Sequence, residues 1–540
     1  MKAQCLPFSQ IPHTTRLFAD FLSYSPKVWP FYPRSPRFVE WFKDAASNLR
    51  YLETTRKQVS DILERQNRGW NASAKTLENV ARLRAGAAAV VTGQQVGLFG
   101  GPLFSIFKAL TAVKLAEEAT AGGVDCVPVF WLATQDHDLE EVSHVALPQA
   151  DASLPTLTAS THSLRDAPVG AITFGAEVEP VVAAAAELLG DSEITKLLHD
   201  SYRPGETFGS AFARLFAGLF GEWGVILLDA SDPELSKLSQ PVYRAAIERA
   251  AELNDKLLAR GRELEAADYH QQVKITAAST LLFALRNGSR VPVHMEPRKG
   301  EPAEFRIEKE VMPQSELLRR IDAEPQNFSA NVLLRPIKQD YLLPTIAYTG
   351  GPAEVAYFAQ AAVVYETLAE NVTAIVPRFS ATLIEHKAEQ LLERYHLSLL
   401  QVFCGPDQLR ERLAAHSLAQ DLQRSFEQAE LSVEKSLADI REKLVSLDKT
   451  LLDSATHAGE KMKYQLTQLR ARAARAELRH TEVLARHADF LSATLYPNKT
   501  MQEREVAGVH FLSRHGLQLL RGLYDTIRTD CLEHQAITLD

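Results

Sequence analysis

The sequence predicts an α/β protein with a parallel sheet, followed by a helical coiled coil. Within residues 87–385, apolar runs that end in polar residues alternate with stretches of helical periodicity. Such runs are typical of parallel strands that helices cover on both faces. Beyond about residue 385, apolar residues recur at spacings of mostly four and three among charged residues, which is the pattern of a coiled coil.

The composition is that of a globular protein with more than one domain. The chain has 540 residues, of which 46% are hydrophobic and 24% charged, and this length predicts about three or four units, fewer if one is large. The net charge of 59 − 68 = −9 gives no reason to expect nucleic-acid binding. The sequence has neither a signal-peptide core nor a run of roughly 18 apolar residues. We therefore expect a cytoplasmic protein with neither nucleic-acid nor membrane partners.

The four cysteines, Cys5, Cys126, Cys404 and Cys531, lie far apart in the sequence. No CxxC pair exists, so we expect no protein-bound zinc of the usual thiolate type. Reduced and mostly buried thiols are the expectation for a cytosolic protein.

Residues 1–86 are expected to form a helical approach segment that packs on the core. A short helical piece at 17–22 precedes an aromatic, proline-broken stretch at 28–33, and residues 36–84 have mostly helical periodicity.

The first motif is a strand, a glycine-rich loop and a helix. Residues 87–91 predict a buried strand, and Pro102 can open the helix that follows. Backbone N–H groups at such a helix start can hold a phosphate or a carboxyl group that is being activated. The other interpretation is that the glycines only let strand and helix pack closely, and the spacing matches neither a dinucleotide fingerprint nor a P-loop. The candidates for binding the nucleotide or the activated carboxyl are Thr92, Gly93, Gln94, Gln95, Gly97, Gly100, Gly101 and Lys108.

The second motif follows the next apolar strand, residues 127–132. Asp136, His137 and Asp138 come directly after it, and ligands in such sheets bind beyond the carboxyl ends of the strands. The three residues could hold a metal, orient an ammonium group or act as acid and base, and we take them as the catalytic candidates. The alternative is that an aspartate caps the following turn, with His137 as its partner.

Two insertions are expected in the core, at about 146–215 and 267–325. The first has strand-like pieces and a helix, the second has two strands, and a further core strand lies between them. The ranges are 154–159, 171–174 and 179–199 in the first insertion, 291–294 and 304–307 in the second, and 224–229 for the core strand.

The third motif repeats the first, with a strand, Gly-Gly-Pro and a helix. Glu354 lies in the first turn of that helix, where its negative charge interacts favourably with the helix dipole or binds a substrate amine. Arg335 precedes a proline, which predicts an extended backbone, and it could clamp a carboxylate or pair with Asp340. A strand at 373–377 follows. The substrate-binding candidates are Asn331, Arg335, Gln339, Asp340, Tyr341, Gly350, Gly351, Glu354, Tyr357, Arg378 and Ser380.

Residues 386–494 predict a coiled-coil arm, and residues 495–540 a terminal helical segment. A turn between 446 and 459 would fold the arm into an antiparallel hairpin. The alternative, one long helix on the core, does not require apolar spacing over so many turns. We expect the arm to form a homodimer.

Together, the motifs resemble the cysteine-adding enzymes (cysteine ligases) of bacillithiol biosynthesis. Gln135 stands where we expect an acidic residue in that family, so this position keeps hydrogen bonding and loses a charge. The resemblance covers nearly the whole chain and is carried by TGQQVGLFGGPLFSIFKALTAVKLA (92–116), VPVFWLATQDHDLEEV (127–142), NVLLRPIKQDYLLPTIAYTGGPAEVAYFAQ (331–360), VPRFSATLIE (376–385) and LYPNKTMQER (495–504).

The resemblance implies a Rossmann-like core of the nucleotidylyltransferase type and a coiled-coil dimerisation arm. It implies a ligase that joins the carboxyl group of cysteine to the amine of glucosaminyl-malate, the last step of bacillithiol synthesis. Magnesium-bound ATP would activate the carboxyl group. His137 would hold a phosphate or take the amine proton, the neighbouring aspartates would orient it or bind an amino group, and Arg335 and Arg378 would bind the malate carboxylates.

Two other functions are compatible with the sequence. One is another nucleotide-dependent enzyme of the nucleotidylyltransferase type, which would release pyrophosphate without forming an amide. The other is a non-catalytic coiled-coil scaffold with a ligand-sensing α/β domain, which would bind without turnover.

Overall fold

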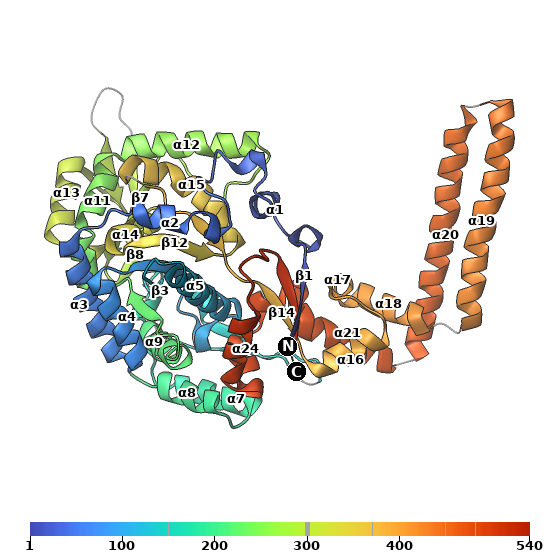
Figure 1. Ribbon diagram of the computed structural model, residues 1–540, viewed down its shortest axis with the longest axis horizontal. Coiled ribbons are helices and arrows are strands. Elements are labelled where there is room, and N and C mark those ends of the chain that lie inside the picture. The colour runs from blue at the N-terminus through green and yellow to red at the C-terminus, as the bar shows by residue number, and fades with distance from the viewer. Residues whose placement is uncertain are drawn as a thin grey trace. The chain divides into compact units, whose positions relative to one another are not determined.

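The computed structural model describes residues 1–149, 151–161, 163–296, 303–369, 371–417, 420–448, 450–480 and 482–539 (Figure 1). The chain forms two compact units. The first comprises 1–147, 155–382 and 503–537, and the second comprises 148–154, 383–502 and 538–540. None of the described helices is both long and apolar enough to cross a membrane.

The first unit is built on a five-stranded parallel sheet in the order β13-β12-β2-β3-β6, which confirms the predicted fold class. The helix after β2 packs on β2 and β3, and the helix after β12 packs on β12 and β13. The strand order reverses between β2 and β12, which is where ligands bind in such sheets. The strands are β2 (Ala88–Gln94), β3 (Cys126–Leu132), β6 (Ile226–Asp229), β12 (Thr345–Gly350) and β13 (Ile375–Pro377), and the two helices are α5 (Phe104–Ala121) and α15 (Pro352–Leu368).

Strand β2 is longer than predicted and takes three residues out of the glycine-rich loop. It runs through Gln94, and the hydroxyl of Thr92 donates a 2.9 Å hydrogen bond to the carbonyl of Thr349 in β12. Helix α5 begins only at Phe104, so the prediction that Pro102 opens it is wrong. A 3₁₀ turn, Leu98–Gly100, lies between strand and helix, and Pro102 instead forms a β-bridge with Ala507.

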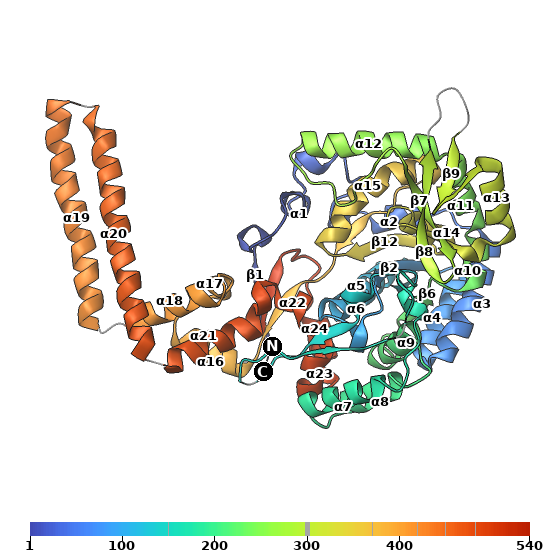
Figure 2. The same ribbon diagram turned by 180° about the vertical axis from the view of Figure 1, so that it is seen from behind.

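The second insertion forms a five-stranded antiparallel sheet, which Figure 2 shows around β7, β8 and β9. It contains both predicted strands and three more. The first insertion differs from prediction, because residues 171–174 form no strand and Gly190, at φ +78°, divides the expected helix in two. The elements are β7 (Ser279–Arg286), β8 (Ser289–Glu296), β9 (Glu304–Ile307), β10 (Glu310–Pro313) and β11 (Phe328–Ala330), and β4 (His144–Ala146), β5 (Thr156–Thr158), α7 (Val178–Leu189) and α8 (Glu193–Ser201).

The prediction of an extended Arg335 is wrong, because Arg335 is the first residue of α14 (Arg335–Leu342). The side-chain oxygen of Asn331 accepts hydrogen bonds from the N–H groups of Leu333 and Leu334, both 3.0 Å, and fixes the chain entering the helix. Pro336 follows in the first turn, where a missing N–H leaves no helical hydrogen bond unmade.

A third sheet, in the order β1-β15-β14, pairs the first strand of the chain with the last. The strands β1 (Lys2–Leu6) and β15 (His534–Thr538) lie in segments that we predicted as helical, and β14 spans Ala381–Ile384. A disulfide joins Cys5 and Cys531, so the prediction of reduced thiols is wrong for this pair. Cys126 and Cys404 are free. The two bonded cysteines are 526 residues apart, and no local spacing signals such a bond.

The second unit contains the predicted coiled coil, whose two long helices run side by side in Figures 1 and 2. The first, α19, ends at Leu447 and the second, α20, begins at Leu451, which places the turn inside the predicted range. Lys463 pairs with Glu434 at 2.6 Å across the antiparallel hairpin. The helices of this unit are α16 (His386–Arg394), α17 (Leu399–Val402), α18 (Pro406–Ser417), α19 (Gln420–Leu447), α20 (Leu451–His480) and α21 (Glu482–Leu495).

The remaining helices belong mainly to the first unit and surround its sheets (Figure 1). They are α1 (Arg16–Leu22), α2 (Phe42–Ser47), α3 (Glu53–Gly69), α4 (Ala74–Ala85), α6 (Leu139–Val142), α9 (Phe208–Leu219), α10 (Pro233–Leu238), α11 (Gln240–Glu248), α12 (Ala250–Ala266), α13 (Gln314–Ala323), α22 (Gln502–Glu505), α23 (Gly508–His515) and α24 (Gln518–Thr526).

Candidate active site

A cavity of about 480 Å³ opens at the carboxyl ends of the parallel strands. Each strand of the sheet supplies residues to its wall at or just beyond its end. The cavity therefore lies at the position where the topology predicts a ligand. In the strand order of the sheet, the contributing residues are Arg378, Gly351, Gln94, Gln135 and Ala230.

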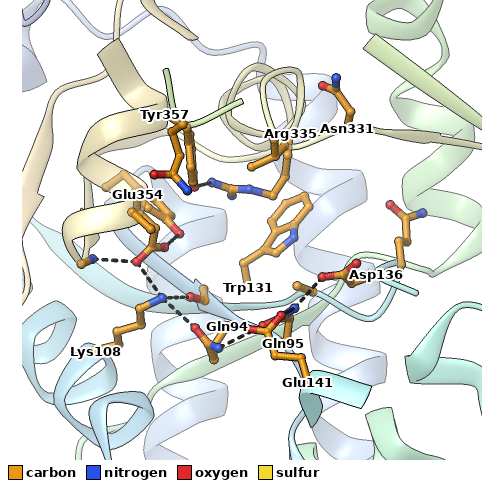
Figure 3. A pocket seen from close by; sticks show the side chains of 18 of the residues that line it. Gln94, Gln95, Lys108, Trp131, Asp136, Glu141, Asn331, Arg335, Glu354 and Tyr357 are labelled. Carbon is orange, nitrogen blue, oxygen red and sulfur yellow. Dashed lines mark hydrogen bonds and ion pairs between the residues drawn. The ribbon is translucent and has the colours of Figure 1, made fainter. Parts of the chain in front are cut away.

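One side of the cavity is formed by a buried ion pair between the helices that follow the two central strands. Lys108 of α5 lies 2.7 Å from Glu354 of α15 (Figure 3), and their side chains are 5% and 14% exposed. The Lys108 ammonium also donates to Gly93 O and Gln94 Oε1, each at 2.8 Å. Burial lowers the pKa of Lys108 to about 8, although the nearby carboxylate of Glu354 opposes that shift. Lys108 thus combines a fixed position with an ammonium that titrates near neutral pH.

Glu354 is held by three groups. Its carboxylate accepts hydrogen bonds from the Tyr348 hydroxyl at 2.6 Å and from the Gly351 N–H at 2.7 Å, in addition to the contact with Lys108. Burial alone would raise the pKa of Glu354, but the charge and hydrogen bond of Lys108 outweigh it and lower that pKa. Because its carboxylate accepts the N–H of Gly351, Glu354 caps the start of helix α15. Its binding of a substrate amine stays a prediction.

The opposite side of the cavity is acidic. Gln95 Nε2 donates to Asp136 Oδ2 at 2.7 Å and to Glu141 Oε2 at 2.8 Å, and Figure 3 shows Gln94 between these side chains and Lys108, in contact with both Lys108 and Gln95. The glycine-loop motif and the Asp-His-Asp motif therefore meet through Gln95 and Asp136. Two carboxylates held around one amide form a surface that suits an ammonium or amine.

Arg335 lies above the cavity and is held in place by aromatic side chains. Its guanidinium donates to the Tyr357 hydroxyl at 2.8 Å and to Gln339 Oε1 at 2.9 Å. Its central carbon lies 4.8 Å from the centre of the Tyr348 ring. No ion pair with Asp340 forms, so Arg335 is a fixed cation that keeps its charge for a ligand.

Arg378 forms a buried ion pair at another part of the wall. Its guanidinium bonds the Glu503 carboxylate at 2.6 and 3.0 Å, and both side chains are 3% exposed. Its Nε is buried without a hydrogen-bond partner. The guanidinium of Arg504 and that of Arg378 lie 5.8 and 5.2 Å from the centre of the Phe104 ring. Since Lys108 and Arg378 are paired with Glu354 and Glu503, the net positive charge of this part of the cavity comes from Arg504.

His137 and Asp138 do not line the cavity. The Arg290 guanidinium donates to His137 Nδ1 at 3.2 Å, and Asp138 caps α6 by accepting from the Glu141 N–H at 3.1 Å. Arg290 itself lines the cavity, and burial lowers its pKa to about 10 although Asp136 opposes the shift. For Asp138, the capping interpretation describes the structure, and His137 contacts the site through Arg290.

Several other predicted residues lie behind the cavity wall. The loop glycines close the turn against buried side chains. Gly100 donates its N–H to the Tyr202 hydroxyl at 3.2 Å, and a Cβ atom at this position would lie only 3.1 Å from the side chain of Leu215. Asp340 and Tyr341 line a different cavity of about 620 Å³. The predicted residues outside the wall of the first cavity are Thr92, Gly97, Gly100, Gly101, His137, Asp138, Gln339, Asp340, Tyr341, Gly350 and Ser380.

The predicted residues that the structure does bring together are Gly93, Gln94, Gln95, Lys108, Asp136, Asn331, Arg335, Gly351, Glu354, Tyr357 and Arg378. The sequence prediction missed Arg290 and Arg504, which come from the second insertion and the C-terminal segment. No motif marks Arg290, whereas Arg504 ends the stretch LYPNKTMQER (495–504) that carries the resemblance. Trp131 and Tyr348 were assigned only to strands, although alternate residues near a strand's carboxyl end can face a site. Among the described residues, no three His, Cys, Asp or Glu side chains gather as a metal site requires.

Comparisons with known proteins give one consistent result. The family described as bacillithiol biosynthesis BshC, N-terminal Rossmann-like domain, matches residues 1–379, and the BshC C-terminal coiled-coil domain matches residues 381–539. A protein of Koribacter versatilis named "Putative cysteine ligase BshC" is 48% identical over 537 residues, covering 99% of this chain and 100% of the relative. A protein of the same name from Solibacter usitatus is 35% identical over 540 residues and all of both chains. The comparison with solved structures finds the methionyl-tRNA synthetase of Mycobacterium tuberculosis in complex with methionyl-adenylate. The match covers 81% of this chain and 94% of the synthetase chain, at 9% identity and a TM-score of 0.22.

Proposed function

The chain belongs to the bacillithiol biosynthesis BshC family, whose curated members are named as cysteine ligases, and on that premise we propose that it joins the carboxyl group of L-cysteine to the amine of glucosaminyl-malate with the use of ATP. The observation that carries the proposal is the division of one cavity into a cationic side and an acidic side. Amide formation requires both, because an activated carboxyl is anionic and the attacking amine carries a proton that must leave.

The cationic side suits the anionic groups of the reaction. ATP would supply the leaving group that a free carboxylate lacks. Arg335 would hold the phosphate oxygens or the carboxyl group that becomes activated, because neighbouring side chains fix its guanidinium. Lys108, whose three N–H donors are bonded to Glu354, Gly93 and Gln94, would support this binding through its charge. Their preorganised charges stabilise negative charge as it develops on the reacting oxygens.

The acidic side suits the amine. Asp136 and Glu141 would bind the ammonium form of the acceptor, and Asp136 would take the proton that the nitrogen loses as it attacks the acyl carbon. Gln95 holds both carboxylates in place. His137, which contacts Arg290 outside the cavity wall, would act indirectly, by holding Arg290 beside Asp136 at 3.9 Å.

The part of the wall around Phe104 suits the malate carboxylates. Arg504 is exposed and can bind an additional carboxylate, while Arg378 keeps its pair with Glu503 and supports binding through its charge. Ser380, which donates to Glu503 at 2.9 Å, would support that pair rather than touch substrate.

We also propose that the protein is a cytoplasmic homodimer formed by the coiled-coil hairpin. Large apolar side chains remain exposed on α19 and α20, among them Leu431 at 66% and Tyr464 at 60%. A second copy would cover them. In a reducing cytoplasm Cys5 and Cys531 would be free thiols, and the bond between them would form only under oxidising conditions.

The test is mass spectrometry of a reaction with the purified protein, ATP–magnesium, L-cysteine and glucosaminyl-malate, with each component omitted in turn. We expect a bacillithiol peak that disappears when ATP is omitted, and the nucleotide product, AMP or ADP, identifies the activation. Asp136→Asn should lower kcat at least about 100-fold, as loss of a general base does. Asp255→Asn, the same substitution at an exposed position of α12, is the matched surface control.

Each contrary result has a defined meaning. A product that persists without ATP contradicts ATP-dependent activation and indicates a pre-activated donor. Pyrophosphate release without amide formation identifies a nucleotidylyltransferase-like enzyme. Binding of nucleotide or thiol without turnover by folded protein identifies a sensing scaffold.

A further inference from the structure

Lys338 is a buried lysine directly behind one wall of the cavity. It belongs to α14, and its side chain is 0% exposed. Its Nζ lies 3.4 Å from Gln135 Oε1 and 3.4 Å from the carbonyl oxygen of Ala230, and both residues line the cavity. The ring centres of Trp131 and Tyr243 lie 5.8 and 5.5 Å from the ammonium. Only residues that Lys338 itself contacts therefore separate its charge from the cavity.

The charge of Lys338 lacks a carboxylate partner. In the part of the chain that the structure describes, no carboxylate oxygen lies within ion-pair distance of its Nζ, whereas Lys108 has Glu354 at 2.7 Å. Two oxygens at 3.4 Å and two aromatic rings solvate the ammonium only in part. An anionic group bound on the other side of Gln135 would complete its surroundings.

Lys338 also determines which way the Gln135 amide points. An ammonium has only donors, so the atom of Gln135 that faces it must be the oxygen. The opposite orientation would bring two donors together. Nε2 therefore points away from Lys338, and the described residues provide no acceptor for it. Since Gln135 lines the cavity, its N–H groups are free to donate to a ligand.

We propose that Lys338 positions Gln135 as a hydrogen-bond donor to an anionic oxygen of a substrate, either a carboxylate or a phosphoryl oxygen. Lys338 is a positioning residue in this inference, and Gln135 is the residue that determines specificity. The inference rests on the proposed function for the identity of the substrates. The positive charge behind the amide strengthens the preference for an anionic acceptor over a neutral one.

The test compares Gln135→Met and Lys338→Met by steady-state kinetics with ATP, cysteine and glucosaminyl-malate varied in turn. Gln135→Met keeps a side chain of similar volume and removes its N–H donor, so KM for one substrate should rise at least about tenfold while kcat changes little. A rise for ATP identifies a phosphoryl oxygen, and a rise for cysteine or glucosaminyl-malate identifies a carboxylate.

The KM of Lys338→Met separates positioning from a merely structural role. This variant leaves the donor of Gln135 in place but no longer orients it, so it should raise the same KM about threefold, because the amide is then free to rotate. A merely structural role would instead lower the Tm and leave KM unchanged.

Two results would overturn the inference. One is unchanged KM for all three substrates in Gln135→Met when the wild-type protein is active. The other is a fall in Tm without any change in KM in Lys338→Met and Gln135→Met alike. If the wild-type protein has no ligase turnover, the proposed function fails. The Kd of each substrate is then measured by calorimetry for the wild-type protein and the variants. Equal Kd values in variant and wild type, or no binding by the wild type, overturn the inference as well.

Discussion

Lys108 and Lys338 are both buried lysines beside the same cavity, and their surroundings give them different properties. Lys108 has a carboxylate partner at 2.7 Å and a pKa that burial lowers to about 8. Lys338 has oxygen contacts at 3.4 Å and no carboxylate partner among the described residues. The first can therefore switch its charge near neutral pH, while the second acts through the amide that it orients.

The pKa of Lys108 predicts an alkaline limb in the pH dependence of the reaction. Because the folded-state pKa lies below the ordinary value of about 10.4, the folded protein loses this proton as the pH rises through about 8. The anion-binding charge is lost with it, so kcat/KM should decline above that pH. Lys108→Arg keeps its charge and should lack the limb, which a series from about pH 6.5 to 9.5 would measure.

A matched substitution controls for general effects of arginine. Lys114→Arg changes a lysine of the same helix that donates to the Tyr524 carbonyl outside the cavity, and it should keep the alkaline limb of the wild-type protein. An unchanged limb in Lys108→Arg would contradict the assignment of the limb to Lys108.

Single residues were predictable where a motif placed a polar side chain at the end of a strand. Asp136 lines the cavity for that reason, and Lys108 and Glu354 line it from the helices that follow two of the strands. Gly97 and Gly100 do not line it, because Tyr202 and Leu215, distant in sequence, fill the space beside them. Arg504 could not be predicted, since only the folded chain brings the C-terminal segment to Phe104.

Among the elements, the antiparallel hairpin of α19 and α20 has an inner and an outer surface. Phe426 and Leu437 are 8% and 6% exposed, whereas Leu431 and Leu469 are 66% and 54% exposed. The hairpin therefore uses part of its apolar pattern for its own seam, and the remaining apolar side chains are available for a second copy.

The outer surface predicts how the dimer can be broken. Leu431→Lys together with Leu469→Lys should convert a dimer into a monomer, because lysines at the centre of an apolar contact remain unpaired. Size-exclusion chromatography with multi-angle light scattering measures this change. Glu430→Lys, next in sequence to Leu431, is the control and should remain dimeric. A doubly substituted protein of unchanged mass would show that the hairpin is not the interface.

Elements were predictable where periodicity and burial agree. The central strands are buried apolar runs, and the long helices repeat their apolar residues regularly. Strand β1 was missed because four of its five residues are exposed, so it lacks the apolar signal of a buried strand. Helix α14 was only partly predictable, since the side chain of Asn331 outweighs the extended preference of the residue before Pro336.

For the whole molecule, the Cys5–Cys531 disulfide ties the N-terminal strand to the C-terminal segment. Such a bond lowers the conformational entropy of the unfolded chain by closing a loop of nearly its full length. Its stabilisation is about 6 kcal/mol in the loop-closure description, whereas disulfides typically contribute about 2–4 kcal/mol. Neither cysteine lines the active-site cavity, so the bond should affect stability more than catalysis.

Reduction should therefore lower the Tm of the protein without abolishing ligase activity. Thermal unfolding with and without dithiothreitol measures the effect. Cys5→Ser should have the lowered Tm under both conditions, while Cys404→Ser, which leaves the bond intact, should respond to the reductant as the wild-type protein does. Equal Tm values for oxidised and reduced wild-type protein would show that the bond contributes nothing to stability.

The pairing of β1 with β15 has a consequence for engineering. Because the first and last strands are neighbours in one sheet, a short peptide can join the natural ends into a closed backbone. The chain can then be opened elsewhere, and the turn between Leu447 and Leu451 at the tip of the hairpin is far in sequence from every residue of the cavity. A circular permutant opened there keeps the order of the parallel strands and separates the two long helices onto opposite ends of one polypeptide.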